Sequence, residues 1–88
     1  MKAKINQEVS VISVFSSKHK TAQPRLINWQ NKDYKVGSIG YHHVIYNGTV
    51  YHHIFELADI EQTLWFRLNL NTKNLHWTLE EVSDGNAD

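Results

Sequence analysis

The chain has 88 residues and a formal net charge of zero, with 41% hydrophobic and 11% aromatic residues. This length predicts one domain with a modest core, because chains this short bury only about 60–65% of their unfolded surface. The absence of cysteine excludes a disulfide framework and any thiolate metal site. No apolar run could span a bilayer and no secretory segment opens the chain, so we expect a cytoplasmic protein without a membrane partner.

The charges are unevenly distributed along the chain. Residues 1–37 carry seven basic and two acidic side chains, a net of +5, whereas residues 38–88 carry two basic and seven acidic ones, a net of −5. Such asymmetry can mark a basic binding face. We favour the alternative, in which basic and acidic strands lie side by side and neutralise each other.

Composition also sets the expected domain boundaries. Residues 1–7 are predicted to be a flexible polar arm, residues 8–82 a single β domain, and residues 83–88 a disordered acidic tail. Within the domain, strand-like runs are separated by turn signals at intervals of about 8–12 residues. This spacing predicts an all-β fold of about six antiparallel strands, in a meander that forms a small barrel or a half-open roll.

Three segments outside the centre of the chain have clear strand patterns. Residues 8–16 alternate and then slip by one position, which is typical of a β-bulge. Residues 24–36 read as a hairpin in which Pro24 opens the first strand, since proline cannot sit in the centre of a sheet. Residues 63–70 form the cleanest strand, with Leu64, Phe66, Leu68 and Leu70 on one face.

The central segment, residues 41–57, predicts a long hairpin around Asn47-Gly48. Asn-Gly between two β-rich runs indicates a type I′ turn, because both central residues of that turn need a positive φ. A two-residue loop at Asn47-Gly48 would place His43 opposite His52. One face would carry Tyr41, His43, Ile45, Val50, His52 and Ile54, and the other His42, Val44, Tyr46, Thr49, Tyr51, His53, Phe55 and Leu57. Neither face is plainly polar, so one is expected to cover the core and the other to meet a partner.

Several aromatic and apolar positions form a recognisable skeleton. It comprises Pro24-x-x-Ile27-x-Trp29, Tyr34-x-Val36, His53-x-Phe55-x-Leu57 and Trp77-x-Leu79-x-x-Val82. In this skeleton the chain resembles small uncharacterised bacterial all-β domain proteins. The resemblance implies a type of fold and no mechanism. Some of these proteins look like appendages of proteins acting on DNA, which favours nucleic acid by analogy only.

The histidines of the hairpin are the candidate metal ligands. A directly opposed pair of His43 and His52 could share a Zn²⁺ ion, with a third ligand from His19, His76, Glu56 or another chain. The alternatives are half-buried histidines that hydrogen-bond locally, or a proton-linked switch, because two adjacent imidazoles resist double protonation. We expect no obligatory cofactor.

An interaction module is the function that the sequence favours. The expected contact residues for a second copy or another protein partner are Tyr41, Ile45, Val50, Ile54, Trp65 and Arg67. The alternative is a platform for single-stranded nucleic acid, built on Trp65 and Arg67 with the basic residues Lys18, Lys20, Arg25, Lys32 and Lys35. An enzyme is not expected, because the chain has no cysteine nucleophile, no Gly-x-Ser-x-Gly, no phosphate-binding glycine loop and no His-Glu-x-x-His.

Overall fold

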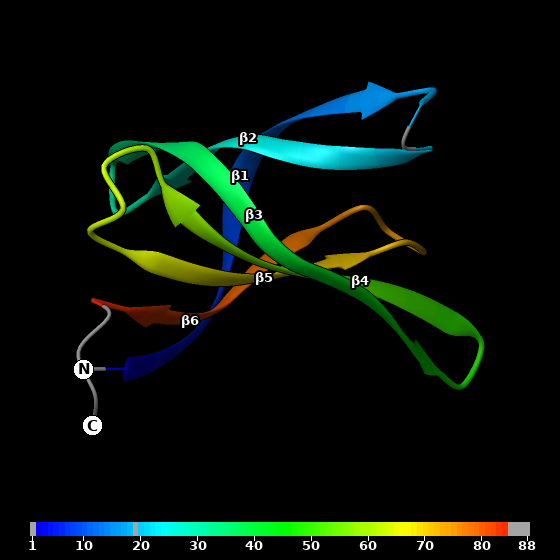
Figure 1. The fold of residues 1–88 in the computed structure, drawn as a ribbon. Coiled ribbons are helices and arrows are strands. Elements are labelled where there is room, and N and C mark those ends of the chain that lie inside the picture. The colour runs from blue at the N-terminus through cyan, green and yellow to red at the C-terminus, as the bar shows by residue number, and fades with distance from the viewer. Residues whose placement is uncertain (1, 19, 85–88) are drawn as a thin grey trace.

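The structure, a computed structural model, describes residues 2–18 and 20–84. Its regular elements are the strands β1 (Lys2–Ser16), β2 (Thr21–Trp29), β3 (Lys32–Asn47), β4 (Val50–Asp59), β5 (Trp65–Asn71) and β6 (Trp77–Ser83). Each strand pairs antiparallel with the next, and β6 pairs with β1, so that the meander closes into a ring (Figure 1). The predicted all-β meander of six antiparallel strands is confirmed.

The N-terminal segment closes the ring, and the flexible arm predicted for residues 1–7 is not seen over residues 2–7, which belong to β1, while residue 1 lies outside the described residues. Residues 2–4 pair with residues 81–83 of β6, and Ile5 packs against the core. An irregularity in the pairing follows at Asn6, which has a φ of 51°. The polar composition was misleading because this segment contributes mainly backbone hydrogen bonds. Ser83, placed in the predicted tail, is the last residue of β6, and residues 85–88 of that tail lie outside the described residues.

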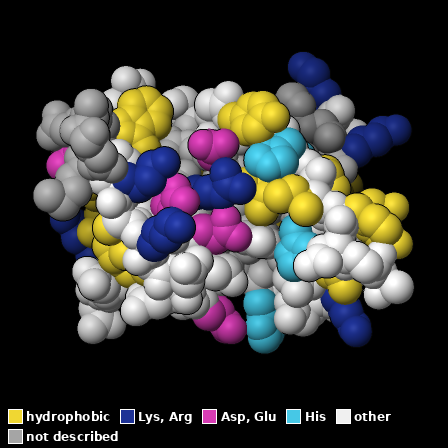
Figure 2. Space-filling model, turned by 90° about the horizontal axis from the view of Figure 1, so that it is seen from below, with side chains coloured by type: hydrophobic (Ala, Val, Ile, Leu, Met, Phe, Trp, Pro, Cys, Tyr) yellow, Lys and Arg dark blue, Asp and Glu magenta, His cyan; other side chains and the backbone are white. Residues whose placement is uncertain are grey.

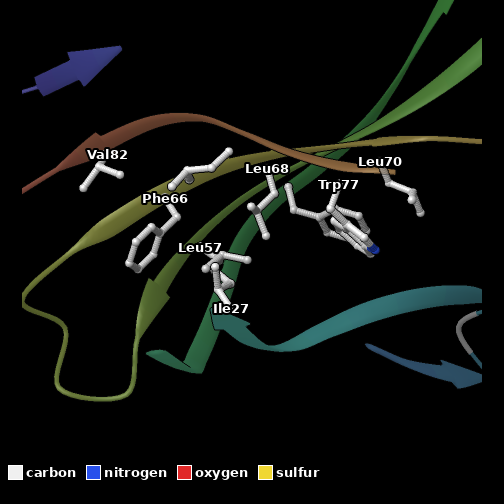
Figure 3. Close-up of a cluster of buried hydrophobic side chains, with 9 residues drawn as sticks. Ile27, Leu57, Phe66, Leu68, Leu70, Trp77 and Val82 are labelled. Carbon is white, nitrogen blue, oxygen red and sulfur yellow. The ribbon is translucent and has the colours of Figure 1, made fainter. Parts of the chain in front are cut away.

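The interior of the ring is filled by side chains from alternate positions of the strands. Phe66, Leu68 and Leu70 of β5 are buried, as the alternation of residues 63–70 predicts, and Leu64 is half-buried against the same core. The buried cluster consists of Ile27, Phe55, Leu57, Phe66, Leu68, Leu70, Trp77, Leu79 and Val82 (Figure 3). Burying one such Leu or Phe contributes about 1.5–3 kcal/mol, so this cluster is the main source of stability.

The central hairpin is confirmed, but its register differs from the predicted one by two residues. The loop is Gly48-Thr49, and Asn47 lies opposite Val50. Gly48 has a φ of 66°, whereas neither Asn47 nor Thr49 has a positive φ. A single positive φ at the first central position is the pattern of a type II′ turn. A shift by two residues changes every cross-strand partner but leaves both faces of the ribbon as predicted.

The β2 strand contains a proline, and its pairing shows how that residue is accommodated. Pro24 is the fourth residue of β2 and is buried, so it does not open the strand as predicted. The pairing of β2 with β3 joins residues 26–29 to residues 32–35, so Pro24 lies beyond the part of β2 that pairs with β3. It also lies next to a bulge in the pairing of β1 with β2, between Ile12 and Ser13, which the phase slip in residues 8–16 predicts. Bulges and edges are the positions at which a strand tolerates proline.

The connection between β4 and β5 is held by a buried carboxylate. Asp59 accepts hydrogen bonds from the backbone N–H of Thr63 at 2.8 Å, from the Thr63 hydroxyl at 2.8 Å and from the backbone N–H of Leu64 at 3.2 Å. Burial alone would raise the pKa of Asp59, but the hydrogen bonds from Leu64 and Thr63 outweigh it and lower that pKa. The connection then packs onto β3, where the Ile60 N–H donates to the Lys35 carbonyl at 2.9 Å.

Gly37 is the position where this connection touches β3, and it yields a stability prediction. A Cβ atom at Gly37 would lie 2.6 Å from the Asp59 carbonyl oxygen and 2.7 Å from the Ile60 Cα. We expect Gly37→Ala to lower the free energy of unfolding by about 1–3 kcal/mol, because backbone atoms must move to admit the methyl group. Gly40→Ala is the matched control, since its Cβ would meet only the Glu56 carbonyl oxygen, at 3.6 Å. Urea unfolding of both variants checks the prediction, and equal midpoints would contradict it.

Candidate functional site

The up-and-down order of the strands places three connections at the same end of the ring. These are the β1–β2 connection at residues 17–20, the β3–β4 turn at Gly48-Thr49 and the β5–β6 connection at residues 72–76. They lie together at the right of Figure 1, while the start of β1 and the end of β6 lie at the left. We call this the hairpin end, and define it by residues 12–21, 42–53 and 70–76 within the described part of the chain.

Exposed hydrophobic side chains are concentrated at the hairpin end. Of eleven large hydrophobic residues that are exposed among the described residues, eight belong to it. They are Ile12, Val14, Phe15, Val44, Ile45, Tyr46, Tyr51 and Leu75. Phe15 and Leu75 are each 69% exposed and Tyr46 is 59% exposed. Concentrated exposure of this kind on a small domain usually marks a contact surface.

The hairpin end also lacks carboxylates. Residues 9–32, 34–55 and 62–79 contain no Asp or Glu, and these ranges include all three hairpin connections. Lys18, Lys20 and Lys73 lie on those connections. On the face shown in Figure 2, acidic side chains occupy the left and middle of the molecule, and the right-hand end carries basic, histidine and hydrophobic side chains. The topology therefore turns a balanced sequence into a molecule with one basic end.

An aromatic series runs from the core to the rim of the hairpin end along the inner face of the β3–β4 ribbon. Trp77 in the core lies 5.7 Å from Phe55, measured between ring centroids, and His42 stacks on Phe55 at 4.3 Å and 2°. The next ring is His53, whose Nδ1 is 2.8 Å from the Nε2 of His42. Farther out, the exposed rings of Tyr46 and Tyr51 lie opposite each other, with centroids 4.7 Å apart.

Thr72 holds this tip in place by donating two hydrogen bonds to the Tyr51 carbonyl, from its N–H at 3.1 Å and its hydroxyl at 2.7 Å.

The paired histidines are electrostatically coupled. Partial burial lowers the pKa of His42, and the charges that His53 and His43 would carry lower it further. At a nitrogen–nitrogen distance of 2.8 Å one ring must donate and the other accept, so the bond holds only one proton. Protonation of both rings would break this bond beside the exposed tyrosines.

The predicted direct opposition of His43 and His52, on which the candidate metal pair was based, is wrong. His43 lies opposite Ile54 and His52 lies opposite Ile45, because the register is shifted. His52 instead has its Nδ1 2.9 Å from the Asn69 side-chain oxygen, and the buried Nδ1 of His43 has no hydrogen-bond partner in the described part of the chain.

The third ligands considered for that metal pair do not join it either. His76 lies 3.2 Å from Glu8, Glu56 lies beside Arg67, and His19 is outside the described residues. The described residues contain no cluster of three or more His, Asp or Glu side chains that could hold a metal ion.

The predicted contact residues do not form one surface. Ile45 is exposed and Val50 half-buried near the tip of the hairpin, whereas Tyr41 and Trp65 line a separate groove on the side of the ring. Ile54 is only 1% exposed and is unavailable for contact, so its assignment to a binding surface is wrong. Its neighbours Phe55 and Leu57 fill the core from the opposite face of β4. Both faces of β4 are covered at this point, which the alternation of the sequence does not indicate.

Arg67 is already occupied by carboxylates. Its Nε donates to Glu80 at 2.8 Å, and its Nη1 lies 3.6 Å from Glu56. The hydrogen bond to Glu80 raises the pKa of Arg67, as do the charges of Glu56 and Glu81, against a smaller opposite effect of burial. Glu80 also accepts from the Asn69 side chain at 2.9 Å. This network leaves Arg67 poorly placed to neutralise a phosphate, and the lysines of the hairpin end are better placed.

The predictions from sequence did not include six residues of this site. They are Phe15, Tyr46, Tyr51, His42, His53 and Lys73. One feature of the sequence could have pointed to this end of the ring. The three ranges without Asp or Glu contain every second connection of the predicted meander, and such connections lie at the same end. No family model, curated protein or solved structure matches the chain, so the resemblance stated above stays a prediction. Among the described residues there is no helix with the length and hydropathy needed to cross a membrane.

The coupled histidines predict an acid-sensitive stability. Because the pKa of His42 is lower in the folded chain than in the unfolded one, the unfolded chain binds more protons at mildly acidic pH. We therefore expect the melting temperature to fall as the pH drops below about 6.5, the ordinary histidine pKa, and to level off below the folded pKa.

The matched variants for this prediction are His42→Gln and His76→Gln. His42→Gln should flatten the profile of melting temperature against pH between pH 7.5 and 5, because it removes the ring whose proton uptake differs between the two states. His76→Gln removes an exposed histidine outside the pair and should leave the slope unchanged. Equal flattening by both variants would contradict the assignment.

Proposed function

We propose that the chain is a non-enzymatic binding module whose hairpin end binds single-stranded nucleic acid. The observation that supports this most is that the exposed rings and the connections carrying Lys18, Lys20 and Lys73 share one end of the ring. Residues 12–21, 42–53 and 70–76, which define this end, include no Asp or Glu, and Glu8 of β1 contacts it at His76. Proteins that hold single strands combine aromatic rings, on which bases stack, with a basic track for the phosphates. A carboxylate among those rings would repel the phosphates, so its absence matters as much as the lysines do.

Tyr46 and Tyr51 are the expected stacking residues. They project from the tip of a two-stranded ribbon, and the Thr72 hydrogen bonds fix the backbone of β4 beneath them. Phe15 supplies a third exposed ring on the neighbouring β1–β2 ribbon. One base stacked on one aromatic ring contributes about 1–3 kcal/mol in such sites, largely independent of the base. This arrangement favours binding with little sequence preference.

The lysines predict a modest dependence on salt. Three phosphate contacts on a single strand give a slope of about −2 in a plot of log K against log salt concentration. We expect a fluorescent oligothymidine to bind about 16-fold more weakly at 200 mM than at 50 mM salt, by fluorescence anisotropy. Lys18→Gln with Lys20→Gln should weaken binding and reduce the slope to about one third, while Tyr46→Ala with Tyr51→Ala should weaken binding at both salt concentrations.

The controls come from the opposite end of the ring. Lys35→Gln and Ile60→Ala remove an exposed charge and an exposed apolar side chain there, and both should bind like the unchanged chain. The proposal fails if the oligonucleotide does not bind at 50 mM salt, or if these controls lose as much affinity as the hairpin variants.

Protein docking, including self-association, is the second candidate function. It is supported by unpaired strand edges beside the same apolar side chains. Within the described part of the chain, residues 21–25 of β2 and 36–47 of β3 do not pair with each other across the seam between these two strands. Exposed edges of this kind favour pairing with another chain. The salt dependence of binding distinguishes nucleic-acid binding from protein docking, because an apolar contact persists at ionic strengths that weaken contacts with phosphates.

Light scattering over a concentration series tests self-association. If the hairpin end binds a second copy, the mass of metal-stripped protein should rise from 10.3 kDa toward twice that value, in low and high salt alike. Val14→Ser with Phe15→Ser should shift the midpoint to higher concentration, because both apolar side chains are exposed on the β1–β2 ribbon. A mass of 10.3 kDa at every concentration would exclude self-association.

A further inference from the structure

A second, independent site lies on the outer face of the sheet formed by β3, β4, β5, β6 and the start of β1. It is a groove of about 290 Å³ that is lined by Tyr41, Trp65, Gly40, Glu56, Arg67 and Glu81, among others. Tyr41 is 55% exposed and Trp65 is 42% exposed, and they stand on β3 and β5 with β4 between them. Strands two apart are separated by about 9–10 Å, which leaves room for one small group between two aromatic walls.

Gly40 keeps the groove open although the backbone does not require glycine there. Its φ is not in the left-handed region, and an added Cβ would meet only the Glu56 carbonyl oxygen at an ordinary contact distance of 3.6 Å. Gly37 is different, because close backbone contacts exclude any side chain at that position. The missing side chain at Gly40 therefore leaves space between Tyr41 and Trp65 that local folding does not demand.

The charges around the groove leave one carboxylate underused. Arg67 is hydrogen-bonded to Glu80 at 2.8 Å, and Glu81 lies 3.5 Å from Lys2. Glu56 is 49% exposed and contacts only the Nη1 of Arg67, at 3.6 Å, which is longer than a hydrogen bond. Lys2 also lines the groove and pairs with Glu81, and Glu56 is the more exposed of these two lining carboxylates, at 49% against 27%. Glu56 stands on β4, between the strands that carry Tyr41 and Trp65.

We propose that this groove binds an alkylated ammonium group. Aromatic faces attract such cations through their quadrupoles, and a nearby carboxylate adds to this attraction. A primary ammonium has three N–H donors and a guanidinium has five, and Glu56 alone cannot satisfy them. An alkylated ammonium has few donors or none, so it loses little on leaving water for a groove of this composition. This site differs from the hairpin end in position and in the charge of its ligand.

Nuclear magnetic resonance titration with tetramethylammonium chloride tests the site, with sodium chloride as the salt control. We expect saturable shifts of the Trp65 indole N–H and the Gly40 amide with tetramethylammonium, and no saturation with sodium. Methylammonium and guanidinium should bind at least about threefold more weakly. Shifts equal to those with sodium, or equal binding of guanidinium, would overturn the proposal.

Three variants locate the cation. Glu56→Gln keeps the shape of the side chain and should raise the dissociation constant at least about threefold, while Glu61→Gln, an exposed carboxylate outside the groove, should not. Gly40→Leu should abolish binding by filling the groove, with the dispersion of the amide spectrum reporting its folding. If Gly40→Leu does not fold, Glu56→Gln still decides. Unchanged binding in Glu56→Gln would overturn the assignment.

The ammonium group can belong to a free small molecule or to a methylated lysine of another protein. Choline and a peptide with one trimethyllysine distinguish these sources, and the unmodified peptide serves as the control. At least tenfold tighter binding of the modified peptide than of choline assigns the site to a protein side chain. Equal affinities assign it to a free cation. Tighter binding of the unmodified peptide than of the trimethylated one would overturn the proposed chemistry.

Discussion

The pairing of β1 with β6 is the constraint on which the rest of the structure depends. Residues 2–4 and 7–9 hydrogen-bond to β6 and turn an open meander into a ring, so neither β1 nor β6 is left as an edge along those residues. With the ring closed, the β1–β2, β3–β4 and β5–β6 connections all lie at the hairpin end (Figure 1). It also encloses the side chains that alternate inward, including Ile27, Leu68 and Leu79, which are completely buried. The concentration of apolar and basic groups at one end is a consequence of this closure.

Much of the fold could be predicted because side-chain alternation is local. The leucine stripe of β5 and the composition of both faces of the central hairpin follow from period-two patterns alone. The register does not, because the choice between a loop at Asn47-Gly48 and one at Gly48-Thr49 depends on the contacts that β4 makes with β5. The shift moved His43 from His52 to Ile54, and His42 from a position opposite His53 to one opposite Phe55. The side chains of His42 and His53 still meet, but across a diagonal of the ribbon. Cross-strand pairs were therefore the least predictable part of the site.

The charge pattern is visible in the sequence, but it separates the two ends of the ring rather than the two halves of the chain. Counting along the chain separates a basic half from an acidic half, whereas the ring sorts residues by distance from its two ends. Lys73 from the acidic half joins Lys18 and Lys20 at the hairpin end, while Lys32 and Lys35 lie at the start of β3, next to the other end. The favoured expectation of neutralising neighbours is met on the side of the ring, where Lys2 of the basic half lies 3.5 Å from Glu81 of the acidic half. Arg67 pairs with Glu56 and Glu80 within the acidic half itself.

The division between core and hairpin end also separates the side chains that stabilise the fold from the exposed rings. The buried cluster extends as far as Leu70 and Trp77, and the ribbons beyond it carry Phe15, Tyr46 and Tyr51 into solvent. Exposed rings contribute little burial to folding, so changes to them need not weaken the core. His42 lies at the boundary, stacked on the core ring of Phe55 and bonded to His53 on the side of the exposed tyrosines. Proton uptake at His42 is therefore expected to affect both the core and the hairpin end, because breaking the short bond to His53 disturbs both the stacked ring of Phe55 and the ribbon beyond it.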